Sequence, residues 1–483
     1  MNADKQTLPM RRNRILGVAL ATAFVATTTV ALPSSDKLVV EAGRIITMDG
    51  PDIEDGLIVI ENGRISAIGP RADVEAPWDA PVIGGPELTA FPGFVEAHSN
   101  RGTDRSNENI DVAPFLSLRD SVDPVNFYFE DCRRYGITTI NLQHAYNCVV
   151  GARGMIVRPT GMTVGEMAVR PLHGMKISAR PKSGKSAATQ AQALRRAFSD
   201  LRRYLEGEVQ SQRDSEDTAR REALFQGRER ETPAPAGRPM TGDGWTVDGF
   251  ELVDRRALDD KQTPLLSLVE GRIDAYLEAS NPREVMLALD VARDNGLLGR
   301  AALVIDADCV KAIDAIAEAG VPVIFNGTQV YNEFDPITGE SEEVFALEVL
   351  KEHGVHFALS SQNSTTNSLW YQAALAVGGG LTRDEALAAV TTTPATILGL
   401  GDDVGSLSVG KAGNVVLLTG DPLSIQTWVD TVVIEGEEVY DRETDLRNRH
   451  INEAMEPRGT TPAAPAPSED GSADAEDEEG DEQ

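Results

Sequence analysis

The chain has 483 residues, of which 41% are hydrophobic, enough for one large domain with a smaller appendage or for two domains. Its formal net charge of −31 argues against nucleic acid or an anionic membrane surface as a partner. Three cysteines, Cys132, Cys148 and Cys309, are too few for a disulfide framework and form no Cys-x-x-Cys metal motif. We expect them to be small buried side chains, with a single bridge as the alternative.

Residues 1–35 have the pattern of a secretory signal peptide. Three arginines at 11–14 precede the uncharged stretch 15–32, and cleavage is expected after Ala31. The pattern predicts an exported protein, periplasmic or extracellular, without stable membrane insertion after cleavage. An uncleaved anchor is the alternative. The paired arginines also leave the Sec and twin-arginine export routes open.

Two short β-rich segments flank a long central region. Residues 36–90 consist of alternating strand-like segments that break at glycine and at Asn-Gly, a strong hairpin signal. The same kind of pattern returns at 398–445. We therefore predict a small β-sandwich domain built from both chain ends, with a separate domain at 91–397 inserted between its halves.

The central region alternates between strands and helices. Apolar runs of strand length lie at 91–98, 136–145, 175–181, 275–280, 300–307, 321–327 and 356–362. Amphipathic stretches of helix length lie at 282–296, 309–320, 342–354, 368–380 and 382–400. Repeated strand–helix units imply a parallel sheet covered by helices. Seven or eight such units over roughly 300 residues predict an α/β fold of the (β/α)8 TIM-barrel type.

Two segments interrupt this pattern. Residues 183–262 are rich in Arg, Gln, Glu and Ala, which predicts a charged, solvated helix at about 188–230 followed by a loop. A coiled-coil partner helix is the alternative, but the apolar spacing is too short and irregular to favour it. Residues 446–483 are predicted to be a disordered acidic tail, because 460–483 are Pro/Ala-rich and then acidic, a composition typical of disorder.

Two long motifs resemble one known family. FPGFVEAHSN at 91–100 matches a Pro-Gly-hydrophobic-x-Asp-x-His-x-His strand, and VGSLSVGKAGNVVLLTGDPL at 404–423 matches a Val-Gly-Ser-Leu-x-x-Gly-Lys-x-Ala-Asp segment. TTPATILGL at 392–400 resembles the helix that precedes that segment. On these motifs, residues 38–440 resemble the amidohydrolase superfamily, in particular its imidazolonepropionase-like branch. The resemblance implies a split β-sandwich with a (β/α)8 barrel of the metal-hydrolase type.

The same resemblance implies hydrolysis of carbon–nitrogen bonds in small cyclic or linear amides, with one or two divalent metals, zinc among them. The family's metal ligands are two histidines on strand 1, one histidine each on strands 5 and 6, and an aspartate after strand 8 that is also the general base. In this sequence the corresponding positions are, in that order, His98, Asn100, Glu278, Ile305 or Asp306, and Gln362.

Most of the family's metal ligands are therefore replaced. An amide is a poor zinc ligand, and Gln362 has no carboxylate to take a proton from water. His98 remains the one candidate metal ligand; with Glu278 and Asp306 it predicts at most a weakly bound hard cation such as Mg²⁺ or Mn²⁺. The alternative is that His98 is a hydrogen-bonded relic and no metal binds.

Two further side chains lie near these positions. Some family members use a carboxylated lysine on strand 4, and Lys176 is nearby, but we interpret it as a surface or snorkelling lysine. His144 follows another predicted strand, and we expect it to pack or hydrogen-bond there.

These substitutions favour a pseudoenzyme. We predict an exported amidohydrolase-like protein with weak or no metal-dependent activity, which acts as a binding or partner subunit. An amidohydrolase paralogue or a second copy of the chain is the expected partner. The alternative is an active hydrolase of non-peptide carbon–nitrogen bonds with an altered metal set, in which Glu278 or Asp306 is the base.

Overall fold

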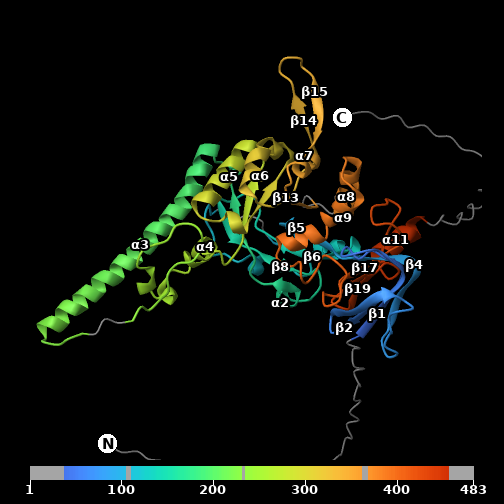
Figure 1. Ribbon diagram of the computed structural model, residues 1–483, viewed down its shortest axis with the longest axis horizontal. Helices are drawn as coiled ribbons and strands as arrows, with labels where there is room; N and C mark the ends of the chain where they lie inside the picture. The colour runs from blue at the N-terminus through green and yellow to red at the C-terminus, as the bar shows by residue number, and fades with distance from the viewer. Residues whose placement is uncertain (1–36, 105–109, 231–233, 362–367, 456–483) are drawn as a thin grey trace, which may run out of the picture. The chain divides into compact units, whose positions relative to one another are not determined.

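Strands from both ends of the chain form one seven-stranded sheet in the computed structural model, which describes residues 37–104, 110–230, 234–361 and 368–455 (Figure 1). The strands are β1 Lys37–Ile45, β2 Ile53–Glu61, β3 Arg64–Pro70, β4 Val82–Pro92, β17 Val415–Leu418, β18 Val429–Ile434 and β19 Glu437–Asp441. Their order is β19-β18-β17-β4-β1-β2-β3. The β-rich part built from both chain ends is thus a single hydrogen-bonded sheet.

The hairpin between β2 and β3 shows how the sequence determines this sheet. Asn62 and Gly63 both have positive φ, 52° and 76°, as a two-residue hairpin turn requires. Along β1, side chains alternate between two apolar clusters: Leu38 and Val40 pack in one and Val39 in the other. The sheet is therefore apolar on both faces at this strand.

The strands of the central region divide between two sheets. A six-stranded sheet has the order β16 Phe357–Leu359, β13 Val323–Phe325, β12 Ala301–Ile305, β11 Ala275–Ala279, β10 Met175–Ser178 and β7 Val150–Arg153. A four-stranded sheet has the order β5 Phe94–Ser99, β6 Ile137–Leu142, β8 Met155–Val157 and β9 Ala168–Arg170. The pairings from β10 to β16 and between β5 and β6 are parallel, whereas β7, β8 and β9 pair antiparallel.

All seven predicted central strands are present, but the described residues do not form one closed eight-stranded sheet. The chain segment of β7 and β8 links the two sheets, because β7 pairs with β10 and β8 with β6. At the other end, Val95 N–H of β5 and Leu359 N–H of β16 donate to the carbonyls of Val390 and Ala389, at 3.0 and 2.8 Å. These two backbone N–H groups therefore bond to the segment between α9 and α10 instead of pairing β5 with β16. The mixed α/β class is confirmed at this level.

Helices cover the central sheets. They are α1 Phe127–Arg134, α2 Val164–Met167, α4 Thr263–Val269, α5 Pro282–Asp294, α6 Ile313–Ala319, α7 Ala346–Glu352, α8 Leu369–Gly378, α9 Arg383–Ala388 and α10 Thr392–Ile397. Short 3-10 turns lie at Leu118–Ser121, Phe250–Leu252, Arg255–Ala257, Leu298–Arg300 and Ala307–Ala312. The predicted helix at 382–400 is two helices, α9 and α10, because Thr391 has non-helical backbone angles.

The charged insertion is a long helix, α3 Ala187–Phe225, which extends away from the central sheets in Figure 1. The prediction of a fully solvated helix is wrong for its first half. Leu194, Leu201 and Leu205 are completely buried there, because they share one face of the helix and pack into the main core. Beyond Val209, which is also buried, the helix is largely exposed, and Phe225 at its end is 94% accessible.

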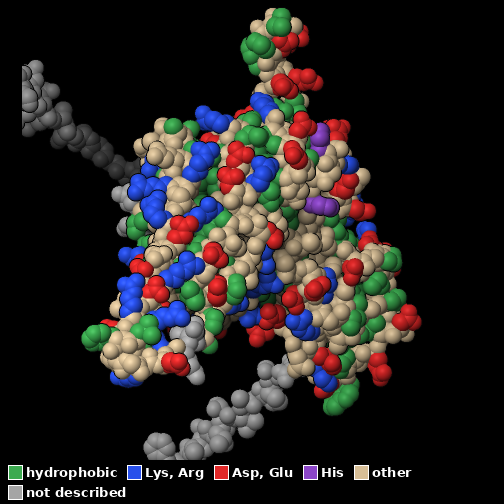
Figure 2. All heavy atoms as spheres, turned by 60° about the vertical axis from the view of Figure 1, so that its left-hand side comes forward, with side chains coloured by type: hydrophobic (Ala, Val, Ile, Leu, Met, Phe, Trp, Pro, Cys, Tyr) green, Lys and Arg blue, Asp and Glu red, His purple; other side chains and the backbone are tan. Residues whose placement is uncertain are grey.

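A second projecting element was not predicted. Residues 342–345, expected to begin a helix, lie in β15 Ser341–Phe345, which forms an isolated hairpin with β14 Val330–Phe334. Figure 2 shows this hairpin standing out from the surface with hydrophobic and acidic side chains. The apolar residues from 342 to 354 have helical spacing throughout. The boundary between β15 and α7 is therefore visible only from the pairing of β15 with β14.

The three cysteines are free and buried, as expected, so the single-bridge alternative is wrong. Among the described residues, no helix has the length and apolar content needed to span a membrane. The predicted signal peptide, Gln362 and most of the acidic tail lie outside the described residues.

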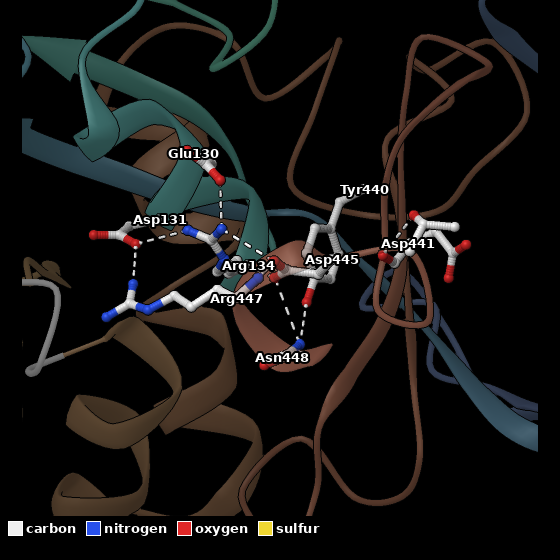
Figure 3. Close-up of polar contacts among 9 residues, drawn as sticks. Glu130, Asp131, Arg134, Tyr440, Asp441, Asp445, Arg447 and Asn448 are labelled. Atoms are coloured by element: carbon white, nitrogen blue, oxygen red, sulfur yellow. Dashed lines mark hydrogen bonds and ion pairs between the residues drawn. The ribbon is translucent and has the colours of Figure 1, made fainter. Parts of the chain in front are cut away.

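A charged cluster ties the C-terminal helix, α11 Leu446–Met455, to α1 (Figure 3). Arg134 donates to Asp445 at 2.7 Å and also contacts Glu130 and Asp131. The Asp445 side chain is only 4% exposed. Its hydrogen bond with Arg134 lowers the pKa of Asp445 and raises the pKa of Arg134. Arg134 therefore links two segments that are more than 300 positions apart in the sequence.

We predict that Asp445→Asn destabilises the fold by about 1–3 kcal/mol, because Arg134 loses its best-buried carboxylate partner. The difference from wild type should be present above pH 3.8, the ordinary pKa of Asp, and disappear as the pH falls through the lowered folded-state pKa. Urea unfolding between pH 2.5 and 7 measures both effects. The exposed neighbour change Glu443→Gln is the control, and equal stability of the two variants at pH 7 would contradict the prediction.

Candidate functional site

A polar cavity of about 200 Å³ lies at the carboxyl ends of the central strands. It is lined by His98, Asn100, Tyr146, Lys176, Arg180, Glu278, Ala279, Val304, Ile305, Asp306 and Asn326. These residues come from β5, β10, β11 and β12 and from the segments that follow β5, β6, β10, β12 and β13. In α/β folds, ligands bind at this end of parallel strands.

The structure brings four of the predicted site residues to this cavity: His98, Asn100, Glu278 and Asp306. Of the two candidates at the end of β12, Ile305 belongs to the hydrophobic core, whereas Asp306 supplies a carboxylate. Burial raises the pKa of Asp306 to about 6, while the positive charge of Arg180 acts in the opposite direction.

The interpretation of Lys176 as a surface or snorkelling residue is wrong. Its side chain is 1% exposed and forms a close ion pair with Glu278. The contact does not have the geometry of a hydrogen bond. The Lys176 Nζ atom also lies 3.4 Å from Nε2 of His98. The strand MKIS looks amphipathic by itself, but β10 lies between β7 and β11 and is buried on both sides.

His98 is a buried, neutral imidazole. Burial, and then the charge of Lys176, keep the pKa of His98 well below its ordinary value. Because the ammonium can only donate, Nε2 must accept and the proton must be on Nδ1. Nδ1 has no hydrogen-bond partner among the described residues, so His98 retains an unused donor next to the cavity.

These residues do not fit the tightly held zinc that the family implies. Zinc needs three or four converging His, Cys or carboxylate ligands, and the described part of the chain contains no group of three such side chains placed to hold a metal. Lys176 moreover places a cation against both His98 and Glu278. A divalent ion at the same ligands would be repelled by that ammonium.

Glu96 holds the first and last central strands together. Its carboxylate accepts hydrogen bonds from the backbone N–H groups of Ser361 and His98, at 3.1 and 3.4 Å. Ser360 Oγ adds a bond to the His98 carbonyl at 3.2 Å. Glu96 is fully buried, which raises its pKa to about 7. Glu96 stands where the family motif has its aspartate.

His144 is buried near this site but does not line the cavity. Burial, and then the charge of Lys176, lower the pKa of His144 to about 4. The expectation that it packs or hydrogen-bonds there is met by packing, and its Nδ1 has no hydrogen-bond partner among the described residues.

Sequence reasoning missed three cavity residues: Tyr146, Arg180 and Asn326. Arg180 lies over the Tyr146 ring at 4.2 Å, and Asn326 accepts a hydrogen bond from Ser360 Oγ at 2.9 Å. Each lies one to four positions after a central strand, a place that could have identified it.

A larger cavity, about 850 Å³, lies at the amino ends of β11, β12 and β16. Its charged lining residues are already engaged: Arg170 donates to the carbonyls of Leu398 and Gly399, and Arg300 to Asp274. Residues at this end of the strands generally serve stability. We therefore place the candidate site at the smaller, polar cavity.

The strand order and the cavity position define an α/β protein with a polar cavity at the carboxyl ends of its parallel strands. Residues 276–439 match the model of the amidohydrolase family. A 75-residue segment is 41% identical to imidazolonepropionase of Pseudomonas putida, covering 14% of this chain and 19% of that protein. A 65-residue segment is 34% identical to 5-methylthioadenosine/S-adenosylhomocysteine deaminase of Moorella thermoacetica, covering 13% and 15%.

The solved structure of an amidohydrolase from Thermotoga maritima shares the fold, with a TM-score of 0.64 and 21% sequence identity. The alignment covers 84% of this chain and all of that one. Residues 276–439 are thus similar to the amidohydrolase family, a shorter segment is similar to imidazolonepropionase, and most of the chain shares the fold of a solved amidohydrolase. It spans about a fifth of the length of the curated relatives that it matches, 19% and 15%.

We predict that Lys176→Met destabilises the fold by about 3 kcal/mol, because Glu278 then remains buried without a compensating charge. The double variant Lys176→Met/Glu278→Gln should recover at least half of that loss, since the buried carboxylate is gone. Urea unfolding of the two single variants and the double variant completes the cycle. Additive effects of the two substitutions would show that the ion pair is not coupled.

Proposed function

We propose that this chain is an exported, amidohydrolase-like binding protein or partner subunit with weak or no hydrolase activity. Its central strands would correspond to the family's closed (β/α)8 barrel, and its polar cavity would bind a small ligand without a metal. The observation that carries the proposal is the buried Lys176 ammonium between His98 and Glu278. The Lys176 ammonium interacts with the two side chains, His98 and Glu278, that a divalent ion would need as ligands.

We expect the purified full chain to contain far less than one equivalent of Zn, Mn, Fe or Ni. Elemental analysis after dialysis against each metal measures this, with His98→Ala as the matched control. Stoichiometric metal in wild type that is lost in His98→Ala would overturn the metal-free site.

A second candidate is an active hydrolase of carbon–nitrogen bonds in small amides. It is favoured by Asp306, whose raised pKa of about 6 suits a general base near neutral pH. In that case, turnover of amides or lactams with added Mn²⁺ or Zn²⁺ should fall at least 100-fold in Asp306→Asn. Equal rates for wild type and the His98→Ala/Glu278→Ala double variant would count against this candidate.

Export is proposed from residues 1–35 alone. We expect the chain recovered outside the cytoplasm to begin at Leu32, after cleavage following Ala31. Intact-mass measurement of the recovered chain tests this. A chain that keeps residues 1–31 would support the uncleaved anchor.

The oligomeric partner, a paralogue or a second copy, is part of the same proposal, and light scattering with and without the paralogue tests it.

A further inference from the structure

Two opposite charges face the cavity, and neither has a hydrogen-bond or ion-pair partner among the side chains that the structure describes. The Arg180 guanidinium lies 4.2 Å from the centre of the Tyr146 ring, but in the described part of the chain no hydrogen bond or ion pair engages it. Asp306 is the N-cap residue of the 3-10 turn Ala307–Ala312, but its carboxylate makes no capping hydrogen bond with that turn. Within the same described ranges this carboxylate has no ion pair either, although Arg180 is near enough to act on it electrostatically.

The other charges of the cavity cancel. Lys176 and Glu278 form an ion pair with each other, and His98 is neutral. Asn100 and Asn326 add amide groups without net charge. Counted over its described lining residues, the cavity therefore offers a ligand one cationic and one anionic group, with no net charge. Such a lining matches a ligand that carries one charge of each sign.

The volume limits the size of that ligand. Pockets for drug-sized molecules generally hold about 300–1,000 Å³, whereas this cavity holds about 200 Å³. The guanidinium presents parallel N–H donors that suit a carboxylate, and its stacking on Tyr146 restricts its orientation. A carboxylate at Arg180 and an ammonium at Asp306 would each replace lost hydration with a charge-assisted hydrogen bond.

We infer that the cavity binds a small zwitterion, a free amino acid, with its carboxylate on Arg180 and its ammonium on Asp306. This inference rests on the proposed function of the cavity as a metal-free binding site. A simple carboxylate or a simple amine would leave one charged side chain of the cavity without a partner on closure. Both should therefore bind more weakly than an amino acid of the same size.

Calorimetry of the full chain with glycine, L-alanine and β-alanine tests the inference, with acetate and ethylammonium as single-charge analogues. We expect at least one amino acid to bind at least tenfold more tightly than either analogue. Arg180→Gln and Asp306→Asn should each weaken that binding at least tenfold. Asp308→Asn is the matched control, because Asp308 lies two residues away on the surface and pairs with Lys311.

No heat from any of the three amino acids would overturn the inference, as would equal binding of acetate or ethylammonium. Unchanged binding in both site variants would overturn it as well, because the ligand would then lie elsewhere. Metal content separates this test from the proposed function. Amino-acid binding by a chain with stoichiometric metal would refute the metal-free site but support the zwitterion inference. A metal-free chain that binds no amino acid would support the metal-free site but refute the zwitterion inference.

Discussion

The buried ammonium of Lys176 is the constraint on which the site depends. It lies against Glu278 and His98 with 1% of its side chain exposed. Burying an ammonium is costly unless a carboxylate compensates it, so Lys176 and Glu278 require each other. The same charge contributes to the low pKa values of His98 and His144. One lysine thus influences the protonation of the polar groups around it.

The Lys176 ammonium distinguishes this cavity from the active site of a metal hydrolase. A metal hydrolase uses a divalent cation to lower the pKa of a water molecule. Here a fixed side-chain cation stands at the corresponding ligands, and an ammonium cannot coordinate water as a Lewis acid. The cavity nevertheless keeps polar groups at the carboxyl ends of the strands. Recognition of a small polar ligand therefore needs less change from this geometry than hydrolysis does.

Several peripheral segments of the protein lie apart from the cavity. The segment between the terminal sheet and α11 is joined to α1 through the ion pair Arg134–Asp445. The distal half of α3 and the β14–β15 hairpin project with exposed apolar side chains, including Phe225 and Ile337. Neither projection contributes to the cavity lining. The site and the projecting surfaces can therefore be altered separately by mutation.

The sequence by itself determined the local elements and the resemblance to a family. Strand-length apolar runs located all seven predicted central strands, because hydrophobic periodicity is a local property. The motifs around His98 and at 404–423 predicted the resemblance to amidohydrolases, and mapping onto strand ends named Asn100, Glu278 and Asp306, which line one cavity with His98.

Only the tertiary structure decided which side chains are buried together. Lys176 looks like a surface lysine until the fold buries both faces of its strand, and Arg180 and Tyr146 are far apart from Asp306 in sequence. The helix-like spacing at 342–345 became a strand because β14 offered a partner. Burial, ion pairing and strand pairing depend on residues distant in the chain, and hydrophobic periodicity carries no information about them.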